Sequence, residues 1–150
     1  MPSGAKSNAR GDGGAAARKI RIFAPAVIVR DREQVAAALA PGLPVTLLSP
    51  PGFALYAGCL WWRALLDQAG FAGLSLLDCA DAPGRAIEAL RLGLGGIVLD
   101  AEPAIFARIA AIAAESGAIL LDKPPPALDL AQRGAIRALA GWLGRAGEPG

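Results

Sequence analysis

Three aspartates recur at a constant interval of 22 residues, and each comes directly after a short apolar run. A glycine stands before each run and a proline follows each aspartate, so every unit begins and ends with the same residue types. A short apolar run between glycine and proline is typical of a buried strand, and the interval leaves room for one helix. The repeat therefore predicts three successive strand-helix units, whose strands end at Asp78, Asp100 and Asp122.

Two further strand-helix units are predicted before the repeat. Ala26–Val29 and Val45–Leu48 are short apolar runs that are typical of strands. Asp31 stands three residues before Gln34, the spacing at which the two side chains cap the start of a helix. Apolar residues recur at helical spacing in the later segments. The five predicted helices span about 32–40, 53–70, 83–92, 103–115 and 129–143.

Strands that alternate with helices over short connections must run parallel, because each helix returns the chain to the same edge of the sheet by a right-handed crossover. A closed eight-stranded barrel of this kind needs about 250 residues, more than the 150 present. The prediction is an α/β fold with an open five-stranded parallel sheet and helices on both faces. This three-layer sandwich is expected to have the flavodoxin-like strand order 2-1-3-4-5.

The charge distribution divides the chain into a basic tail and a slightly acidic domain. Residues 1–21 carry a net charge of +4 and are rich in Gly and Ala, whereas residues 22–150 carry −2. We predict a disordered tail over 1–21, a single α/β domain over 22–145 and a flexible C-terminus over 146–150. Because the domain lacks an excess of positive charge, nucleic acid is not expected to be its main partner.

The predicted location is cytoplasmic. Cys59 and Cys79 are too few for a disulfide scaffold and lack metal-ligand spacing, which fits a reducing compartment. Met1–Gly14 contains no apolar core of the kind that signal peptides have, so export by that route is not expected. The uncharged stretch 44–62 is interrupted by Pro50-Pro51-Gly52, so no membrane span is predicted.

The strand-end aspartates are the main candidates for a binding site. Ligands of open parallel sheets bind beyond the carboxyl ends of the strands, and neighbouring strands there are roughly 5 Å apart. Asp78, Asp100 and Asp122 are therefore expected to bind a small polar ligand or Mg²⁺, a cation that prefers oxygen ligands. Glu102 or Asp81 would complete the metal site, and Ser49, after the second strand, would join the ligand-binding set. Alternatively, the acidic side chains cap the following helices.

Lys123 is the candidate catalytic residue, since it is the only lysine outside the tail and follows a strand end. If it is partly buried, its amine could form a Schiff base with a carbonyl substrate; otherwise it is an ordinary surface lysine. The chain has no histidine, which excludes Ser-His and Cys-His mechanisms and histidine-ligated zinc. It also lacks a glycine-rich dinucleotide motif and a phosphate-binding lysine motif.

The second predicted helix is apolar on nearly all sides and contains Tyr56, Trp61 and Trp62. Such a helix on the outside of a domain predicts a homodimer contact. The alternative is that one tryptophan packs inward and the other lies along a neighbouring helix.

Two resemblances bear on function. The segment Ala86–Asp100 resembles a helix-strand unit of (βα)8-barrel enzymes, including aldolases, which implies a Schiff-base lysine at a strand end, where Lys123 stands. The motifs Val45-Thr46-Leu47-Leu48-Ser49, Leu77-Asp78-Cys79 and Pro126-Ala127-Leu128-Asp129-Leu130 are similar to a family of small uncharacterised proteins from high-GC bacteria. That resemblance covers most of residues 26–140 and implies no activity. Three hypotheses follow: a small-ligand or magnesium-binding domain, an aldolase-type lyase, and a non-catalytic self-assembling protein.

Overall fold

The computed structural model describes residues 23–145, so the tail predicted at 1–21 and the flexible segment predicted at 146–150 lie outside the described residues. Within 23–145 no helix is both long and apolar enough to traverse a lipid bilayer. The described elements are β1 (Ala26–Ile28), α3 (Arg32–Leu39), β2 (Thr46–Leu48), α4 (Phe53–Tyr56), α5 (Cys59–Ala69), β3 (Ser75–Asp78), α6 (Pro83–Arg91), β4 (Gly96–Val98), α7 (Pro103–Ser116), β5 (Ile119–Leu121), β6 (Ala127–Asp129) and α8 (Ala135–Leu143).

Two of the predicted helices have different bounds in the structure. The helix predicted over 53–70 consists of α4 and α5, because Gly58 between them has a φ of +94°, which no helical residue adopts. The helix predicted over 129–143 begins only at Ala135, and the residues before it include the strand β6. The five predicted strands are present as β1 to β5. Together with β6, which was not predicted, they give the described fold six strands instead of five.

The sheet is parallel, as predicted, but its strand order is not 2-1-3-4-5. The six strands lie in the order β5-β4-β3-β2-β1-β6. Strands β1 to β5 are therefore neighbours in chain order, and every crossover among them steps the same way across the sheet. The predicted order was wrong because it required the chain to reverse its direction after β2, and no reversal occurs until β5.

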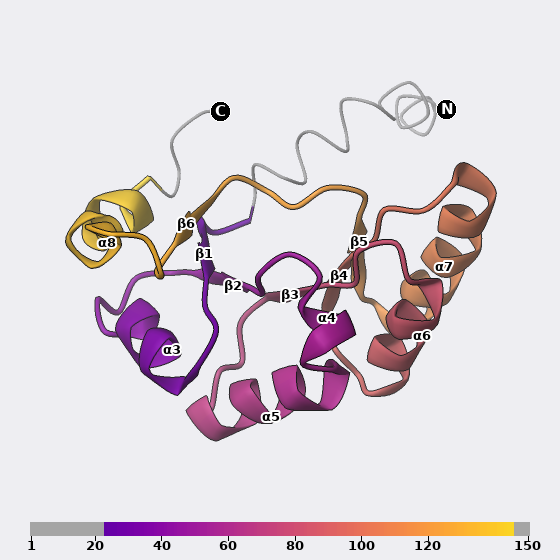
Figure 1. The fold of residues 1–150 in the computed structure, drawn as a ribbon, viewed down its shortest axis with the longest axis horizontal. Helices are drawn as coiled ribbons and strands as arrows, with labels where there is room; N and C mark the ends of the chain where they lie inside the picture. Colours follow the sequence, from indigo (N-terminus) through magenta and orange to yellow (C-terminus); the bar gives the residue numbers. More distant parts are fainter. Residues whose placement is uncertain (1–22, 146–150) are drawn as a thin grey trace, which may run out of the picture.

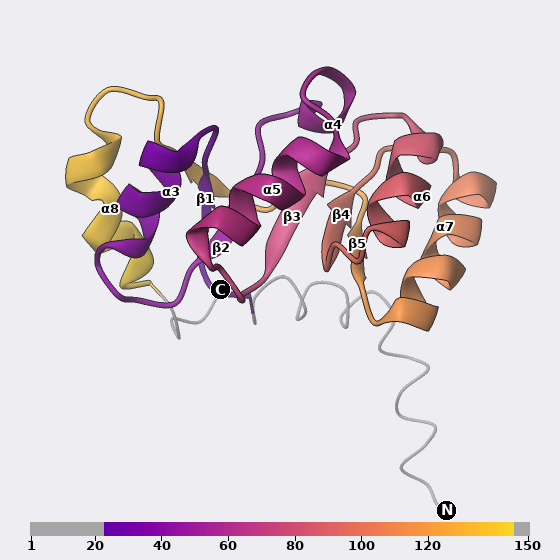
Figure 2. The ribbon, with the colours of Figure 1, turned by 90° about the horizontal axis from the view of Figure 1, so that it is seen from below.

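All the long helices pack on one face of the sheet, so the predicted three-layer sandwich is also wrong. Right-handed crossovers that keep one direction must leave their helices on the same side. One core cluster joins residues of α3, α5, α6, α7 and α8 to strand residues such as Val27, Leu77 and Ile97. In Figure 1, α3 and α5 lie below the sheet. Figure 2, seen from that side, shows α8, α3, α5, α6 and α7 one after another from left to right.

The opposite face of the sheet, here called the open face, has no helix against it among the described residues. Its buried cluster consists only of strand residues, namely Ala26, Leu48, Leu76 and Val98. The connection from β5 to β6, residues 122–126, runs along this side in Figure 1, and it ends in three prolines. This connection steps across the sheet in the opposite direction from the earlier crossovers and passes over the opposite face. Because both are reversed, the connection is still right-handed. It places β6 beside β1, with Val27 opposite Leu128.

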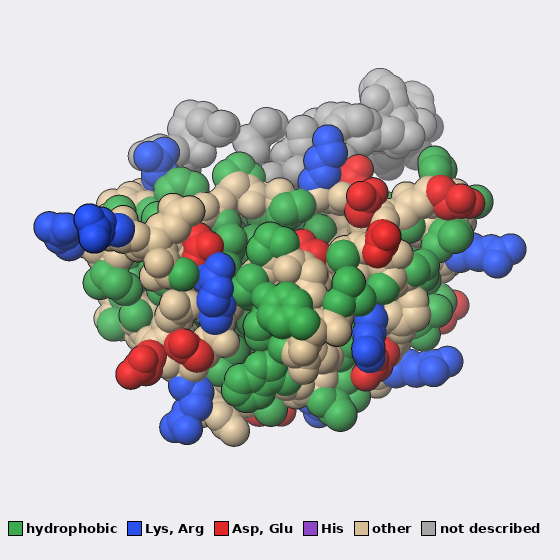
Figure 3. All heavy atoms as spheres, in the orientation of Figure 1, with side chains coloured by type: hydrophobic (Ala, Val, Ile, Leu, Met, Phe, Trp, Pro, Cys, Tyr) green, Lys and Arg blue, Asp and Glu red, His purple; other side chains and the backbone are tan. Residues whose placement is uncertain are grey.

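The two adjacent tryptophans of α5 have opposite environments. Trp62 is completely buried and its ring meets that of Phe53 edge to face, with centroids 5.8 Å apart. Its predicted role in a dimer contact is therefore wrong, since it is a core residue. Trp61 is 43% exposed. It belongs to the apolar patch that Figure 3 shows over α4 and α5, formed by Leu55, Tyr56, Leu60 and Trp61.

The close approach of β3 and β4 requires a glycine at position 96. A Cβ atom there would lie 2.5 Å from the carbonyl oxygen of Ser75 and 2.6 Å from Cδ2 of Leu76. We expect Gly96→Ala to lower the free energy of unfolding by about 1–3 kcal/mol, because the backbone oxygen cannot yield without disturbing the ladder. Urea denaturation measures the change. Gly95→Ala is the control, since no atom lies within 4 Å of a Cβ at that position; equal effects of the two substitutions would contradict this explanation.

Candidate functional site

Side-chain alternation along the strands places two predicted site residues on the open face. Asp78 follows Leu76 by two residues, and Asp100 follows Val98 by two. Leu76 and Val98 belong to the open-face cluster, whereas Leu77 and Leu99 belong to the core beneath the helices. Since side chains two residues apart in a strand point to the same face, both aspartates extend the open face at its carboxyl edge.

A small cavity at this edge brings together the predicted aspartates and the predicted lysine. Its volume is about 250 Å³. We call it the strand-end pocket; it is lined by Asp78, Ala80, Val98, Asp100, Asp122, Lys123 and Pro124. The structure therefore brings Asp78, Asp100 and Asp122 together at the ends of neighbouring strands, with Lys123 beside them. Lys123 is exposed, so the partial burial on which its predicted reactivity depends is not present.

Asp78 holds the walls of the strand-end pocket in place. It is 8% exposed, and its Oδ1 accepts hydrogen bonds from the backbone N–H of Ala80 at 2.8 Å and of Gly52 at 3.1 Å. These donors belong to loops after β3 and β2, so the carboxylate caps loop amides instead of the next helix. Such bonds link two neighbouring strand ends and orient the carboxylate before any ligand arrives.

The pocket wall contains a strained residue. Ala80 has a φ of +52°, in the left-handed region, which costs a non-glycine residue roughly 1–2 kcal/mol. Two hydrogen bonds hold it there, one from its own N–H to Asp78 and one of 2.8 Å from the N–H of Asp100 to its carbonyl. The chain from Asp78 to Asp100 is thereby joined across β3 and β4 at the mouth of the pocket.

Three other predicted site residues do not line the pocket. Ser49 is buried, and its hydroxyl donates to the carbonyl of Pro50 at 3.1 Å and accepts from the N–H of Asp78 at 2.9 Å. Glu102 is the N-cap residue of α7 and is exposed, but its side chain makes no capping hydrogen bond. Asp81 is exposed and also lies outside the lining. Ser49 therefore contributes indirectly, because its hydroxyl holds the backbone of Asp78.

The predicted magnesium ligands are not arranged as a coordination shell. Among residues 23–145, no group of three or more Asp, Glu or Cys side chains is placed so that it could hold a metal ion. One reason is visible at Asp78, whose Oδ1 is already engaged by two amides. The side chains of Asp100 and Asp122 are exposed and accessible to a ligand.

A charged pair at the same edge of the sheet was missed in the sequence. Arg30 follows β1 and Asp129 ends β6, and their side chains form a two-point ion pair with N–O distances of 2.5 and 2.9 Å. The hydrogen bond from Arg30 lowers the pKa of Asp129 below its ordinary value, against a smaller opposing effect of burial. The helix predicted over 129–143 has Asp129 as its first residue, whereas the structure places this residue at the end of β6. The signal in the sequence is the run Pro124-Pro125-Pro126, which favours an extended chain up to the start of β6.

The two cysteines are structural residues. Both are buried and free of disulfide bonds. Burial raises the pKa of Cys59 to about 11 and that of Cys79 to about 12. Both thiols therefore stay protonated at neutral pH and are poor nucleophiles, although Cys79 lies next to Asp78.

Comparisons of the chain with protein families, curated proteins and solved structures found no match. The described residues thus define a class by their fold alone: an α/β domain with a six-stranded parallel sheet and its long helices on one face. The resemblances to aldolase-type barrel units and to proteins of high-GC bacteria stay predictions.

The Arg30–Asp129 pair makes a prediction about acid stability. Because the folded-state pKa of Asp129 is lowered, its stabilisation is complete above the unfolded value of roughly 4 and is lost as the pH falls through the folded value. We expect Asp129→Asn to cost about 1 kcal/mol at pH 7, after allowance for solvent screening of a half-buried pair. The difference from the parent protein should shrink as the pH falls below the unfolded value and through the lowered folded-state pKa of Asp129.

Chemical denaturation across this pH range measures the effect. Asp67→Asn is the matched control, since Asp67 pairs with Arg63 at 3.6 Å and its side chain is 69% exposed. That substitution is expected to change stability little. A cost of Asp129→Asn that is the same at pH 7 and at pH 2 would show that the ion pair is not responsible.

Proposed function

We propose that this protein binds a small polar organic molecule in the strand-end pocket. The observation that supports this function is the composition of the pocket, which collects three strand-end aspartates and the only lysine of residues 23–145. Carboxylates accept hydrogen bonds from hydroxyl and amino groups, while the lysine ammonium donates to a carbonyl or carboxylate oxygen. The preferred ligand thus combines several hydroxyl or amino groups with one acidic or carbonyl group.

The size of the pocket limits the ligand. A volume of about 250 Å³ is below the roughly 300–1,000 Å³ that is usual for pockets of drug-sized molecules. Sugar acids, amino sugars and hydroxy amino acids are of suitable size and polarity. Asp100 and Asp122 are exposed and can contact such a ligand, whereas Asp78 contributes one carboxylate whose orientation is set by Gly52 and Ala80.

Magnesium remains part of the hypothesis in a limited form. Mg²⁺ often uses only one or two protein carboxylates and keeps water or ligand oxygens for its other positions. Asp100 and Asp122 could provide these two. The ion would then accompany a polar ligand instead of being enclosed by the protein.

The first test is a thermal-shift titration with gluconate, glucosamine and serine, each with and without MgCl₂. A ligand at about 100 times its Kd adds roughly 2.7 kcal/mol to the stability of the folded state, and each kcal/mol raises the Tm by about 2–4 °C in a domain of this size. We expect Asp100→Asn to remove most of that rise, because it replaces a charged acceptor in the pocket. Asp81→Asn is the control, since Asp81 is exposed and lies outside the lining. An undiminished rise in the Asp100 variant would place the binding site elsewhere.

A second candidate function is that of an aldolase-type lyase with Lys123 as the nucleophile. The observation in its favour is that Lys123 shares the pocket with Asp100 and Asp122, which could transfer protons during formation of a Schiff base. In that step the amine adds to a substrate carbonyl and water leaves. Only a carbonyl ligand permits this chemistry.

Borohydride trapping tests the lyase hypothesis. Incubation with pyruvate and sodium borohydride should reduce the Schiff base to a stable secondary amine, which peptide mass spectrometry locates at Lys123. Lys123→Met is expected to abolish the labelling, while Lys6 and Lys19 in the same chain serve as internal controls. Labelling spread evenly over the three lysines would mean nonspecific reaction and no activated lysine.

The cytoplasmic location also stays a proposal. The two thiols, Cys59 and Cys79, are both unpaired and buried, which is the condition expected in a reducing compartment.

A further inference from the structure

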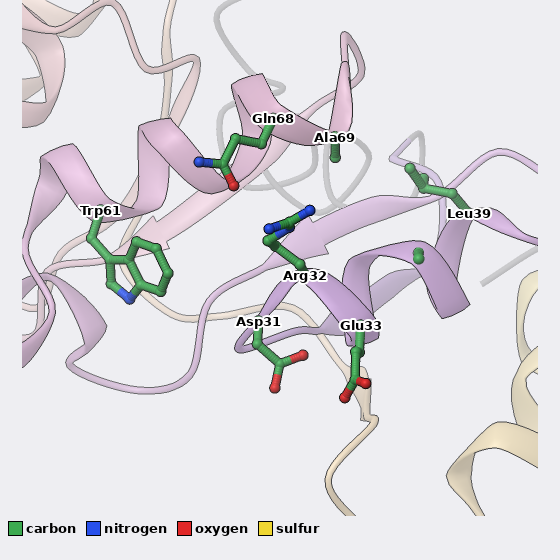
Figure 4. A pocket seen from close by; sticks show the side chains of 8 residues that line it. Asp31, Arg32, Glu33, Leu39, Trp61, Gln68 and Ala69 are labelled. Atoms are coloured by element: carbon green, nitrogen blue, oxygen red, sulfur yellow. The ribbon is translucent and has the colours of Figure 1, made fainter.

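A large cavity lies on the helical side of the domain, between α3 and α5. It is an open groove of about 830 Å³. We call it the α3–α5 groove, and Figure 4 shows its lining side chains. They are Asp31, Arg32, Glu33, Ala36, Leu39, Trp61, Gln68 and Ala69. None of these residues lines the strand-end pocket, so the two cavities are separate.

One wall of the groove is the indole ring of Trp61. This side chain is 43% exposed, although tryptophan is usually well buried in a protein without a partner at that position. Its neighbour Trp62 lies wholly in the core, which anchors this turn of α5 and fixes the side of the helix from which Trp61 projects. The side chains of Ala36, Leu39 and Ala69 complete the apolar part. A flat aromatic surface beside small residues suits a planar ligand.

The polar part of the groove carries a cation without an ionic partner. Within residues 23–145, ion pairs are made by Arg30, Arg63 and Arg85, and Arg32 takes part in none. In Figure 4 the guanidinium of Arg32 extends toward Gln68 across the groove. A guanidinium in this position offers two parallel N–H groups, the geometry that a carboxylate binds best.

The two carboxylates of the lining do not neutralise this cation. Figure 4 shows the side chains of Asp31 and Glu33 directed to the side away from Gln68. Asp31 is the N-cap residue of α3 and its Oδ1 accepts the N–H of Gln34 at 2.9 Å, as the spacing in the sequence predicts. Gln34 in turn accepts the N–H of Arg30 at 2.8 Å, so these groups stabilise the start of the helix. Arg32 is left facing the groove.

We propose that the α3–α5 groove is a second binding site, for a planar aromatic molecule that carries a carboxylate. The ring of the ligand stacks on Trp61, and its carboxylate forms a two-point pair with Arg32, with the amide of Gln68 as a further hydrogen-bond partner. The lining also contains Asp31 and Glu33, so the groove has no net positive charge. Its preference for a carboxylate depends on the directions of the side chains, since Arg32 extends toward Gln68 while the two acidic side chains point away from it in Figure 4. The groove shares no residue with the strand-end pocket and is proposed to bind its ligand independently.

The test uses naphthalene-2-carboxylate with the full chain, with affinity measured by isothermal titration calorimetry. Naphthalene-2-carboxamide, which keeps the ring but has no charge, and cyclohexanecarboxylate, which keeps the charge but has no aromatic plane, are the comparison ligands. We expect each to bind at least about tenfold more weakly, since each lacks one of the two interactions. Arg32→Gln should weaken the binding of naphthalene-2-carboxylate by about the same factor.

Two control variants locate the effect. Arg108→Gln removes another exposed arginine that forms no ion pair within 23–145. Arg108 lies on α7, and Figure 2 shows α6 between α7 and α5. This substitution is expected to leave the affinity unchanged. Asp100→Asn should also leave it unchanged, which separates this site from the strand-end pocket.

A proton–nitrogen NMR spectrum of the three tryptophan indoles shows which ring is contacted. The signal of Trp61, assigned with Trp61→Phe, should move on titration, while those of Trp62 and Trp142 stay in place. Absence of binding, equal affinity for the neutral amide, or equal loss in Arg108→Gln would each overturn the proposal. So would a Trp61 signal that moves on dilution without ligand, because the groove would then be covered by a second copy of the chain.

Discussion

The parallel pairing of strands in chain order is the constraint on which the rest of this structure depends. Each of β1 to β5 takes its place beside the preceding strand, and every helix that joins them returns the chain on the same side. One face of the sheet is consequently buried by helices. The open face carries the strand-end pocket at its carboxyl edge. Asp78 and Asp100 reach the same pocket because strand alternation gives both the same face.

The return from β5 to β6 completes the sheet at its other end. Residues 122–126 contain three successive prolines, which cannot donate to a strand ladder and favour an extended chain. This segment supplies Asp122, Lys123 and Pro124 to the strand-end pocket before it reaches β6. The Arg30–Asp129 pair then joins the carboxyl ends of β1 and β6. The connection 122–126 thus lines the candidate site and also brings β6 to its place beside β1.

The two candidate binding sites differ in the physical origin of their selectivity. The strand-end pocket is formed by loops whose backbone N–H groups, those of Gly52 and Ala80, donate to the carboxylate of Asp78. Its excess of carboxylates favours ligands with hydroxyl and amino groups. The α3–α5 groove is formed by two rigid helices and combines an indole with an arginine that has no ionic partner among residues 23–145. The indole wall and the arginine directed into the groove, seen in Figure 4, favour a flat molecule with a carboxylate. One domain thus presents two candidate sites with different ligand preferences.

The sequence by itself determined five of the six strands, the helices that join them and the shared edge of the aspartates. Apolar runs with glycine and proline at their ends identify strands locally, and equal 22-residue intervals bring their ends to one edge. Only the tertiary structure decided the strand order, the single helical face and the sixth strand, because each depends on the direction of a crossover, which no local pattern encodes. The same holds for Trp61 and Trp62: residues one apart on a helix point about 100° from each other, and packing against Phe53 selects which one is buried.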